Sequence, residues 1–327
     1  MRRDIITLGE ILIDFTPIKS PSGKIGFEQN AGGAPANVMA AITKLGLKTG
    51  FIGCVGDDQF GRFLIDFLKR NHIDDTDLKV SKEYNTTLAF VHLQENGDRD
   101  FSFYRNPGAD QMISEDDIKE SMFNDLKVFH FGSLSLTDEP SRGATLKAIK
   151  LAKEKRCLIS YDPNLRPPLW GSLDQAKNQI LSVMESIDIL KISEEELLFL
   201  TGIKEIEEGS KYLYEKYNTP LIMTTLGEDG CAVRRGEWYE KVGGIKVKAL
   251  DTTGAGDSHL GAMLYQIMMQ EQELKDIPFE VLLKFAKFAN YMAAYVTTQF
   301  GSAEIMPTYD QVNEAVNKGS WDALQLL

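Results

Sequence analysis

The chain has 327 residues, 43% of them hydrophobic, which favours one large or two modest globular domains with a sizeable buried core. With 36 Lys and Arg against 48 Asp and Glu, the formal net charge is −12, and no basic run interleaved with aromatics suggests a nucleic-acid surface. No apolar run approaches membrane-spanning length and the three cysteines lack metal-ligand spacing, so we expect a cytoplasmic protein without a nucleic-acid or membrane partner, a disulfide framework or a structural zinc site.

Short β-branched runs alternate with longer helical patterns over most of the chain. In chain order, these strand-like runs and helical patterns cover residues 4–15, 34–46, 49–56, 58–71, 127–136, 140–156, 157–164, 172–187 and 188–193. This βαβ alternation predicts an α/β fold in which helices cover a largely parallel sheet. Because no low-complexity linker, repeat or long charge run divides the sequence, we expect one domain over residues 1–327.

A different pattern interrupts this alternation near residues 86–106. Two alternating runs, "TTLAFVHLQ" and "RDFSFYR", flank Asn96 and Gly97. Asn-Gly between such runs is a strong signal for an antiparallel hairpin, because both turn positions tolerate positive φ. Together with the irregular stretch 17–30, the hairpin is expected to form a small β lid over the strand ends of the main sheet. We place this lid at about 15–31 and 86–109.

The stretch "LDTTGAGDSHLGAMLY", residues 250–265, ends a plausible strand in a glycine-rich turn and then begins a helix with Asp257 at the junction. Backbone N–H groups at a helix start attract anions such as phosphate. In phosphoryl transfer to an alcohol, a carboxylate beside them accepts the hydroxyl proton; with a pKa near 4 it is a weak base, so its position matters more than its basicity. Taken by itself, Asp257 is better explained as an N-terminal helix residue favoured by the helix dipole.

Two further stretches carry weaker signals. In "NAGGAPANVMAAITKLG", residues 30–46, Gly32 and Gly33 allow a ligand to approach the backbone and Asn37 offers a donor and an acceptor to hydroxyls, although a well-terminated helix after a turn explains the pattern equally well. Asp14 lies near the end of an apolar strand, and α/β sheets bind ligands beyond the carboxyl ends of their strands, so Asp14 is a candidate for binding sugar hydroxyls. The alternative is a carboxylate that is simply solvated at a strand end. Neither a P-loop nor a dinucleotide fingerprint occurs, which argues against a nucleotide hydrolase and a dehydrogenase.

These stretches resemble the ribokinase-like sugar kinases, also called the phosphofructokinase B family. The region "GGAPANVMAAITKLGLKTGFIGCVGDDQFG" is similar to the first signature of that family, and "DTTGAGDSHLGAML" to the second. Shorter stretches, "GEILIDFTP", "FYRNPGAD", "FHFGSLSL", "SYDPNLRPPLW" and "KISEEEL", resemble fructokinases of bacteria and plants. The resemblance implies a three-layer ribokinase-like domain with a small β lid, and ATP-dependent phosphorylation of a sugar.

The resemblance also implies roles for individual residues. Asp257 is the expected catalytic base, beside an anion hole made by the amides of Gly254, Ala255 and Gly256. The expected sugar-binding residues are Asp14, Gly32, Gly33 and Asn37, with the lid closing over them to exclude water. In "TTLGEDG", Thr225, Gly227 and Gly230 are expected near the phosphates and ribose of ATP, and Asn290 near adenine. The alternative for that stretch is an ordinary hairpin turn.

The expected metal sites depart from the family pattern. In the Asn-x-x-Glu motif that organises magnesium and phosphates, Ser193 takes the Asn position while Glu196 is kept. Magnesium is therefore expected to come with ATP, held mainly by phosphates and water and reached by Glu196 through water. The resemblance further implies a potassium site near Asp251 and Thr253; the partner segment keeps Gly301 but lacks a late serine, and Asp251 alternatively belongs to a salt bridge.

Sugar specificity is expected to depend on Tyr104, Arg105 and Arg166. A guanidinium offers rigid paired donors that suit sugar hydroxyls or a substrate carboxylate, and surface ion pairing is the alternative for each arginine. The resemblance implies a fructokinase acting on the 6-hydroxyl of fructose. A 2-keto-3-deoxygluconate kinase and a sensing protein without turnover are the alternatives. Lids of relatives commonly pair, so a homodimer is expected.

Overall fold

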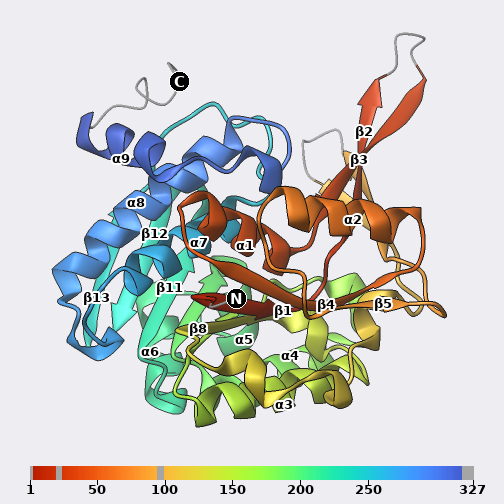
Figure 1. Ribbon diagram of the computed structural model, residues 1–327. Helices are drawn as coiled ribbons and strands as arrows, with labels where there is room; N and C mark the ends of the chain where they lie inside the picture. The colour runs from red at the N-terminus through yellow and green to blue at the C-terminus, as the bar shows by residue number, and fades with distance from the viewer. Residues whose placement is uncertain (1–2, 20–23, 94–98, 319–327) are drawn as a thin grey trace.

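The structure is a computed structural model that describes residues 3–19, 24–93 and 99–318. Within these ranges the chain forms a nine-stranded sheet and a separate four-stranded sheet (Figure 1). The strands are β1 (Ile5–Leu8), β2 (Leu12–Lys19), β3 (Ile25–Gly32), β4 (Thr49–Gly56), β5 (Leu78–Ser81), β6 (Leu88–Leu93), β7 (Arg99–Tyr104), β8 (Val128–Gly132), β9 (Leu158–Asp162), β10 (Ile189–Ser193), β11 (Leu221–Thr225), β12 (Gly230–Arg235) and β13 (Trp238–Gly243).

Helices cover both faces of the large sheet (Figure 1). The helices are α1 (Ala34–Lys44), α2 (Gln59–Arg70), α3 (Ser141–Glu154), α4 (Leu173–Ser182), α5 (Glu194–Thr201), α6 (Ile206–Tyr217), α7 (Ala255–Met268), α8 (Phe279–Thr297) and α9 (Tyr309–Lys318). One core packs the sheet against α1, α2, α7 and α8, and a second core packs it against α3 to α6. Ile5 points into the first core and Ile6 into the second, as expected for a strand buried on both faces.

The large sheet has the order β13-β12-β11-β10-β9-β8-β1-β4-β5. Its strands from β5 to β11 are parallel, whereas the β11–β12 and β12–β13 pairs are antiparallel, so that β12 alone of the described strands of this sheet runs in the opposite direction. The predicted largely parallel sheet between helical layers is therefore present. Parallel strands bring their carboxyl ends to one edge of the sheet, which is where α/β proteins bind ligands. No helix in the described part of the chain has the length and apolarity to cross a membrane.

The small sheet has the order β3-β2-β6-β7, with antiparallel pairs at both edges. Its strands fall mostly inside the two stretches expected to form a lid. The stretch 17–30 was expected to join the hairpin in a small sheet, and its described residues do so as parts of β2 and β3. The β6–β7 pair has the antiparallel direction that the hairpin signal predicted, while the Asn96-Gly97 turn itself lies outside the described residues.

The apolar run 4–15 is not one strand, and this corrects the predicted place of Asp14. At Gly9 the backbone N–H still donates to Ile52 O of the large sheet, but at Ile13 it donates to Thr87 O beside the small sheet. The run therefore divides into β1 and β2. Apolar residues lie on both sides of the Gly9-Glu10 junction, so the hydrophobicity of the run as a whole did not indicate the change of partner. Asp14 is consequently a residue of the small sheet rather than the end of a main strand.

Candidate active site

A cavity of about 620 Å³ lies between the carboxyl edge of the large sheet and the small sheet. Its walls come from β2, β7, the start of α1, the loop after β9, and the start of α7. Eight of the residues expected at the site line it: Asp14, Gly33, Asn37, Arg166, Thr253, Gly254, Gly256 and Asp257. The glycine-rich turn and the expected sugar-binding segment are thus brought to one cavity, although more than 200 residues separate them in the sequence.

Asp257 is the third residue of α7, which begins directly after Gly254 in the left-handed conformation, with φ of 77°. The preceding residues 244–254 are irregular, so the strand expected there is absent. The Ala255 N–H already donates to Thr252 O in a long bond of 3.3 Å. Gly256 and Asp257 belong to the first helical turn, whose N–H groups have no intrahelical partner, and their amides remain for an anion.

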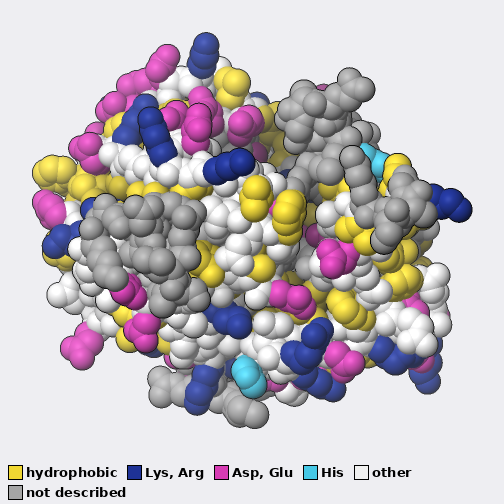
Figure 2. Space-filling model, turned by 90° about the horizontal axis from the view of Figure 1, so that it is seen from above, with side chains coloured by type: hydrophobic (Ala, Val, Ile, Leu, Met, Phe, Trp, Pro, Cys, Tyr) yellow, Lys and Arg dark blue, Asp and Glu magenta, His cyan; other side chains and the backbone are white. Residues whose placement is uncertain are grey.

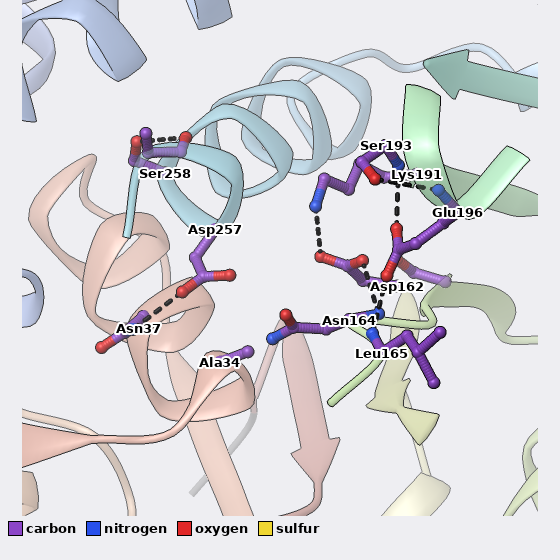
Figure 3. Close-up of polar contacts among 12 residues, drawn as sticks. Ala34, Asn37, Asp162, Asn164, Leu165, Lys191, Ser193, Glu196, Asp257 and Ser258 are labelled. Carbon is purple, nitrogen blue, oxygen red and sulfur yellow. Dashed lines mark hydrogen bonds and ion pairs between the residues drawn. The ribbon is translucent and has the colours of Figure 1, made fainter. Parts of the chain in front are cut away.

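The Asp257 carboxylate is held from α1. Asn37 donates from Nδ2 to Asp257 Oδ2 at 2.7 Å, and Ser302 Oγ donates to Asn37 Oδ1 at 3.2 Å. Figure 3 shows Asp257 and Asn37 pointing toward each other from neighbouring helices. Asn37, expected to bind sugar hydroxyls, therefore also orients the carboxylate expected to act as base.

The pKa of Asp257 is raised to about 6. Burial is the largest cause and the charge of Asp162 is the second; Lys191, the Asn37 hydrogen bond and Arg166 act in the opposite direction. The side chain is only 8% exposed, which explains why burial dominates. Asp257 is consequently a stronger base than a carboxylate with a pKa near 4, while still mostly ionised at neutral pH.

A buried ion pair faces Asp257 across the cavity (Figure 3), and the sequence analysis assigned it no role. Lys191 Nζ lies 2.8 Å from Asp162 Oδ2, and the two side chains are 8% and 2% exposed. A lysine inside the otherwise apolar strand β10 was the available signal, because a charge buried in a central strand requires a partner. We call Asn37, Asp162, Lys191 and Asp257 the buried network.

At the end of the cavity where the sugar is expected, the position of the Asp14 carboxylate depends on the absence of a side chain at Gly32. Leu12 of β2 pairs with Gly32 of β3, and a Cβ atom on Gly32 would lie 2.0 Å from Asp14 Oδ2. Only glycine leaves room for the Asp14 carboxylate in its present position. Glu10, another cavity residue that the sequence analysis missed, accepts the Ala34 N–H at 3.3 Å, and burial raises its pKa to about 7.

The three expected specificity residues lie in different environments. Arg166 lines the large cavity. Arg105 is buried instead of forming a surface ion pair: its guanidinium lies 2.7 Å from Asp110 and also donates to Thr137 Oγ1 and Leu134 O. It lines a second cavity of about 340 Å³, which shares Phe103 and Pro168 with the first. Tyr104 is 66% exposed and packs edge-on against Phe90.

Ser193 and Glu196 form a reciprocal cap at the start of α5. Ser193 Oγ accepts the Glu196 N–H at 3.2 Å, and Glu196 Oε2 accepts the Ser193 N–H at 2.8 Å. Glu196 Oε1 also accepts the Leu165 N–H at 2.6 Å. Both carboxylate oxygens therefore already have backbone partners, which fits contact with a hydrated magnesium ion through water better than a direct cage.

The remaining nucleotide candidates lie away from the large cavity. Thr225, Gly227 and Gly230 belong to the turn between β11 and β12, which is an antiparallel hairpin as the alternative interpretation proposed. Asn290 is buried on α8 and donates to Val242 O and Gly243 O, so its amide ties α8 to β13.

The expected potassium residues join two loops beside the glycine-rich turn at Gly254. Asp251 accepts the Thr253 N–H at 2.7 Å and the Gly301 N–H at 3.3 Å. The described residues contain no cluster of three or more His, Cys, Asp or Glu side chains arranged for a metal ion. A potassium site here would consequently need backbone carbonyl oxygens as its main ligands.

Nearly the whole chain is similar in sequence and structure to known carbohydrate kinases. The family model described as pfkB family carbohydrate kinase matches residues 2–309. Probable fructokinase-2 of Arabidopsis thaliana is 43% identical over 307 residues, covering 93% of each chain. A fructokinase double mutant from Vibrio cholerae O395, in a form with fructose, ADP and potassium ion bound, matches with a TM-score of 0.86 at 32% identity, covering 95% of this chain and 98% of that one. Fructokinase from Xylella fastidiosa with bound ATP matches with a TM-score of 0.88 at 29% identity, covering 97% and 99%. The predicted ribokinase-like fold is confirmed.

Proposed function

The chain belongs to the pfkB family of carbohydrate kinases, and on this premise we propose that it is a fructokinase that transfers the γ-phosphoryl group of ATP to the 6-hydroxyl of fructose. The observation that carries the proposal is the position of Asp257. Its carboxylate lies at the anion-attracting start of α7 and lines the same cavity as Asp14 of the small sheet. One cavity thus offers a base, an anion site and a hydroxyl-binding carboxylate.

The chemistry requires one proton transfer and one phosphoryl transfer. The fructose 6-hydroxyl gives its proton to Asp257, its oxygen forms a bond to the γ-phosphorus, and the bond from that phosphorus to the bridging oxygen of ADP breaks. Negative charge spreads over the transferring oxygens, where the amides of Gly256 and Asp257 stabilise it. Asn37 keeps the carboxylate aimed at the hydroxyl, because its amide already holds Oδ2 at 2.7 Å.

The base has a basicity suited to this role. A pKa of about 6 leaves Asp257 ionised near neutral pH and makes it a better proton acceptor than an exposed aspartate. Protonated Asp257 accepts no proton, so the rate is expected to fall as the pH falls through about 6.

We assign Asp14, Gly32, Gly33 and Arg166 to the sugar, and the small sheet to closure over it. Asp14 and Phe103 of that sheet line the cavity, so closure would bring the sugar hydroxyls against them and exclude water from the phosphoryl group. Arg105 and Tyr104 act less directly, because Arg105 is bound to Asp110 and Tyr104 is exposed.

ATP is the proposed phosphoryl donor, with magnesium held by its phosphates and reached by Glu196 through water. Bound magnesium would neutralise phosphate charge. Thr225, Gly227, Gly230, Ser193 and Asn290 are the residues proposed to lie along the nucleotide. Potassium beside Asp251 and Thr253 is proposed to support the anion-binding turn, in line with the potassium-bound fructokinase from Vibrio cholerae.

A homodimer is proposed to form through the small sheet. Four of its large apolar side chains are exposed: Ile18 (46%), Ile25 (76%), Phe27 (42%) and Tyr104 (66%). In Figure 2, hydrophobic side chains are visible on the right, the side on which Figure 1 places β2 and β3, as well as at the centre and left of the same face. Such a surface gains stability when a second copy covers it.

The direct test is ADP release with magnesium and potassium present, offering fructose and 2-keto-3-deoxygluconate separately at matched concentrations. Preference for fructose, with phosphate found on oxygen 6 of the product by NMR, is the expected result. Preference for the keto acid would overturn the choice of sugar and assign Arg166 to a carboxylate. Absence of turnover with either acceptor would overturn the proposal and favour a sensing protein.

A further inference from the structure

The Lys191 ammonium lies against the backbone of the anion-binding turn. A Cβ atom built on Gly256 would lie 2.9 Å from Lys191 Nζ, so the ammonium occupies the space beside that glycine. Lys191 and Gly256 both line the large cavity, and Figure 3 shows the lysine reaching toward Asp162 on the side facing Asp257. A phosphate held by the Gly256 amide would therefore lie within reach of the ammonium.

The ammonium retains hydrogen-bonding capacity and charge. Within the described part of the chain its one hydrogen-bond acceptor is Asp162 Oδ2, whereas an ammonium has three donors. Burial lowers the pKa of Lys191, but the carboxylates of Asp162, Glu196 and Asp257 raise it, and the net direction is upward. Lys191 is consequently a permanent cation at the cavity wall, with donors left for a ligand.

The motif formed by Ser193 and Glu196 supplies no positive charge for the phosphates. Ser193, which stands where the family motif has asparagine, uses its hydroxyl to cap α5. Glu196 adds negative charge on the same side. Terminal phosphates entering this region would meet the carboxylates of Asp162, Glu196 and Asp257. Lys191 is a cation already placed among these carboxylates, in addition to Arg166 at the cavity wall.

We propose that Lys191 is a catalytic residue that binds the terminal phosphate groups of the nucleotide and follows the phosphoryl group during transfer, and that Asp162 is the positioning residue that holds it there. The proposal rests on the proposed function and deepens it. During the reaction described above, Lys191 stays protonated and donates to the γ-phosphoryl oxygens as charge spreads over them. Binding strengthens in the transition state, so the lysine raises the rate as well as the affinity for ATP.

The alternative is a purely structural pair that ties β9 to β10. The test uses Lys191→Met together with Asp162→Asn, because this double variant leaves no buried charge without a partner. Binding of ATP and of AMP is measured by calorimetry without sugar, and turnover by ADP release. We expect ATP affinity to fall about 10-fold with AMP affinity unchanged, and kcat to fall about 100-fold.

Two further variants distinguish phosphate binding by Lys191 from a role in packing. Lys191→Arg keeps the charge and is expected to recover part of kcat and of ATP affinity, which a packing role would not produce. The control is Lys79→Met with Asp117→Asn, an ion pair of the same 2.8 Å length at the sheet edge strand β5, and it should leave both nucleotide affinities unchanged.

The role of Lys191 and the proposed sugar kinase activity can fail independently. Unchanged ATP affinity and kcat in the Lys191 double variant, or an equal loss for ATP and AMP, would overturn the role of Lys191. Absence of sugar turnover by the unaltered protein would overturn the proposed function, while the ATP and AMP comparison would still decide whether Lys191 binds the terminal phosphates.

Discussion

The two sides of the cavity differ in how their polar groups are held. On the large-sheet side, the buried network consists of side chains at most 8% exposed, each with a partner in the described structure at 2.7 or 2.8 Å. On the small-sheet side, Asp14 is only half-buried and several apolar neighbours face solvent. The first side has the preorganised, desolvated charges that phosphoryl transfer needs, and the second has the exposed surface of an element that moves or pairs.

This contrast implies that chemistry and sugar binding are separable by mutation. Changes in the buried network should act on kcat, because its charges meet the transferring group. Changes at Asp14 or Gly32 should act mainly on the KM for fructose, because they alter how the sugar lies under the small sheet. The predictions below, from largest to smallest expected effect, test that division.

The largest effect is expected for Asp257→Asn. The change keeps the shape and the Asn37 neighbour but removes the proton acceptor, so kcat should fall about 1,000-fold while fructose and ATP still bind. Coupled ADP-release kinetics and calorimetry measure the two quantities. Asp276→Asn, at an exposed aspartate, is the control. Turnover close to that of the control would remove Asp257 from the role of base.

Gly32→Ala should raise the KM for fructose about 100-fold and leave kcat within a few fold. The new Cβ atom would lie 2.0 Å from Asp14 Oδ2 and must displace that carboxylate. Gly26→Ala in the same strand is the matched control, since its nearest neighbour would be Ile18 Cγ1 at 3.4 Å. An unchanged KM would argue that Asp14 does not bind the sugar.

Asn37→Ala should lower kcat about 10-fold and shift the pH dependence. The Asn37 donor favours the ionised form of Asp257, so its loss raises the pKa of Asp257 and moves the acidic fall in rate to higher pH. Rates across the pH range test this, with Asn71→Ala, which removes one helix-end hydrogen bond, as control. A shift to lower pH would contradict the assignment.

The smallest effect on catalysis is expected at the exposed face of the small sheet. Ile25→Ser with Phe27→Ser should weaken the proposed dimer at least about 10-fold while changing kcat less than about twofold. Light scattering against protein concentration measures the assembly. Trp238→Ser, at a side chain 67% exposed on β13, is the control. Equal dimerisation of the variant and the control would place the interface elsewhere.

The sequence predicted best those parts of the site whose residues are close along the chain. The turn at Gly254, the start of α7 and Asp257 are neighbours, so the sequence indicated a glycine-rich turn followed by a helix with a carboxylate at the junction, which the structure contains. The same holds for the helix that begins after Gly33. The roles of base and anion site came from the family resemblance. Alternation of strands and helices likewise sufficed to predict a largely parallel sheet covered by helices, and the family resemblance added the three-layer arrangement.

Contacts between segments that are distant along the chain could not be predicted from local residue patterns. Asp162 and Lys191 are 29 residues apart on separate strands. Asp162 resembles an ordinary strand-end residue, and the lysine inside β10 shows only that a partner is needed, not which residue it is. Asn37 and Asp257 are 220 residues apart, so the hydrogen bond that gives Asn37 its second role was not visible. The division of residues 4–15 between two sheets depends on backbone partners, Ile52 and Thr87, which residue hydrophobicity does not encode.

The central claim is that Asp257, in its buried network, is the base. The most direct test is kcat/KM for fructose at saturating ATP from about pH 5 to about pH 8 for the unaltered protein and for Asp257→Asn. Asp257 faces Asp162, Lys191 and Arg166, and their combined effect with burial places its pKa at about 6. If Asp257 is the base, the rate of the unaltered protein falls below about pH 6, and this fall is absent from the residual activity of the variant. The same acidic fall in both proteins would contradict it.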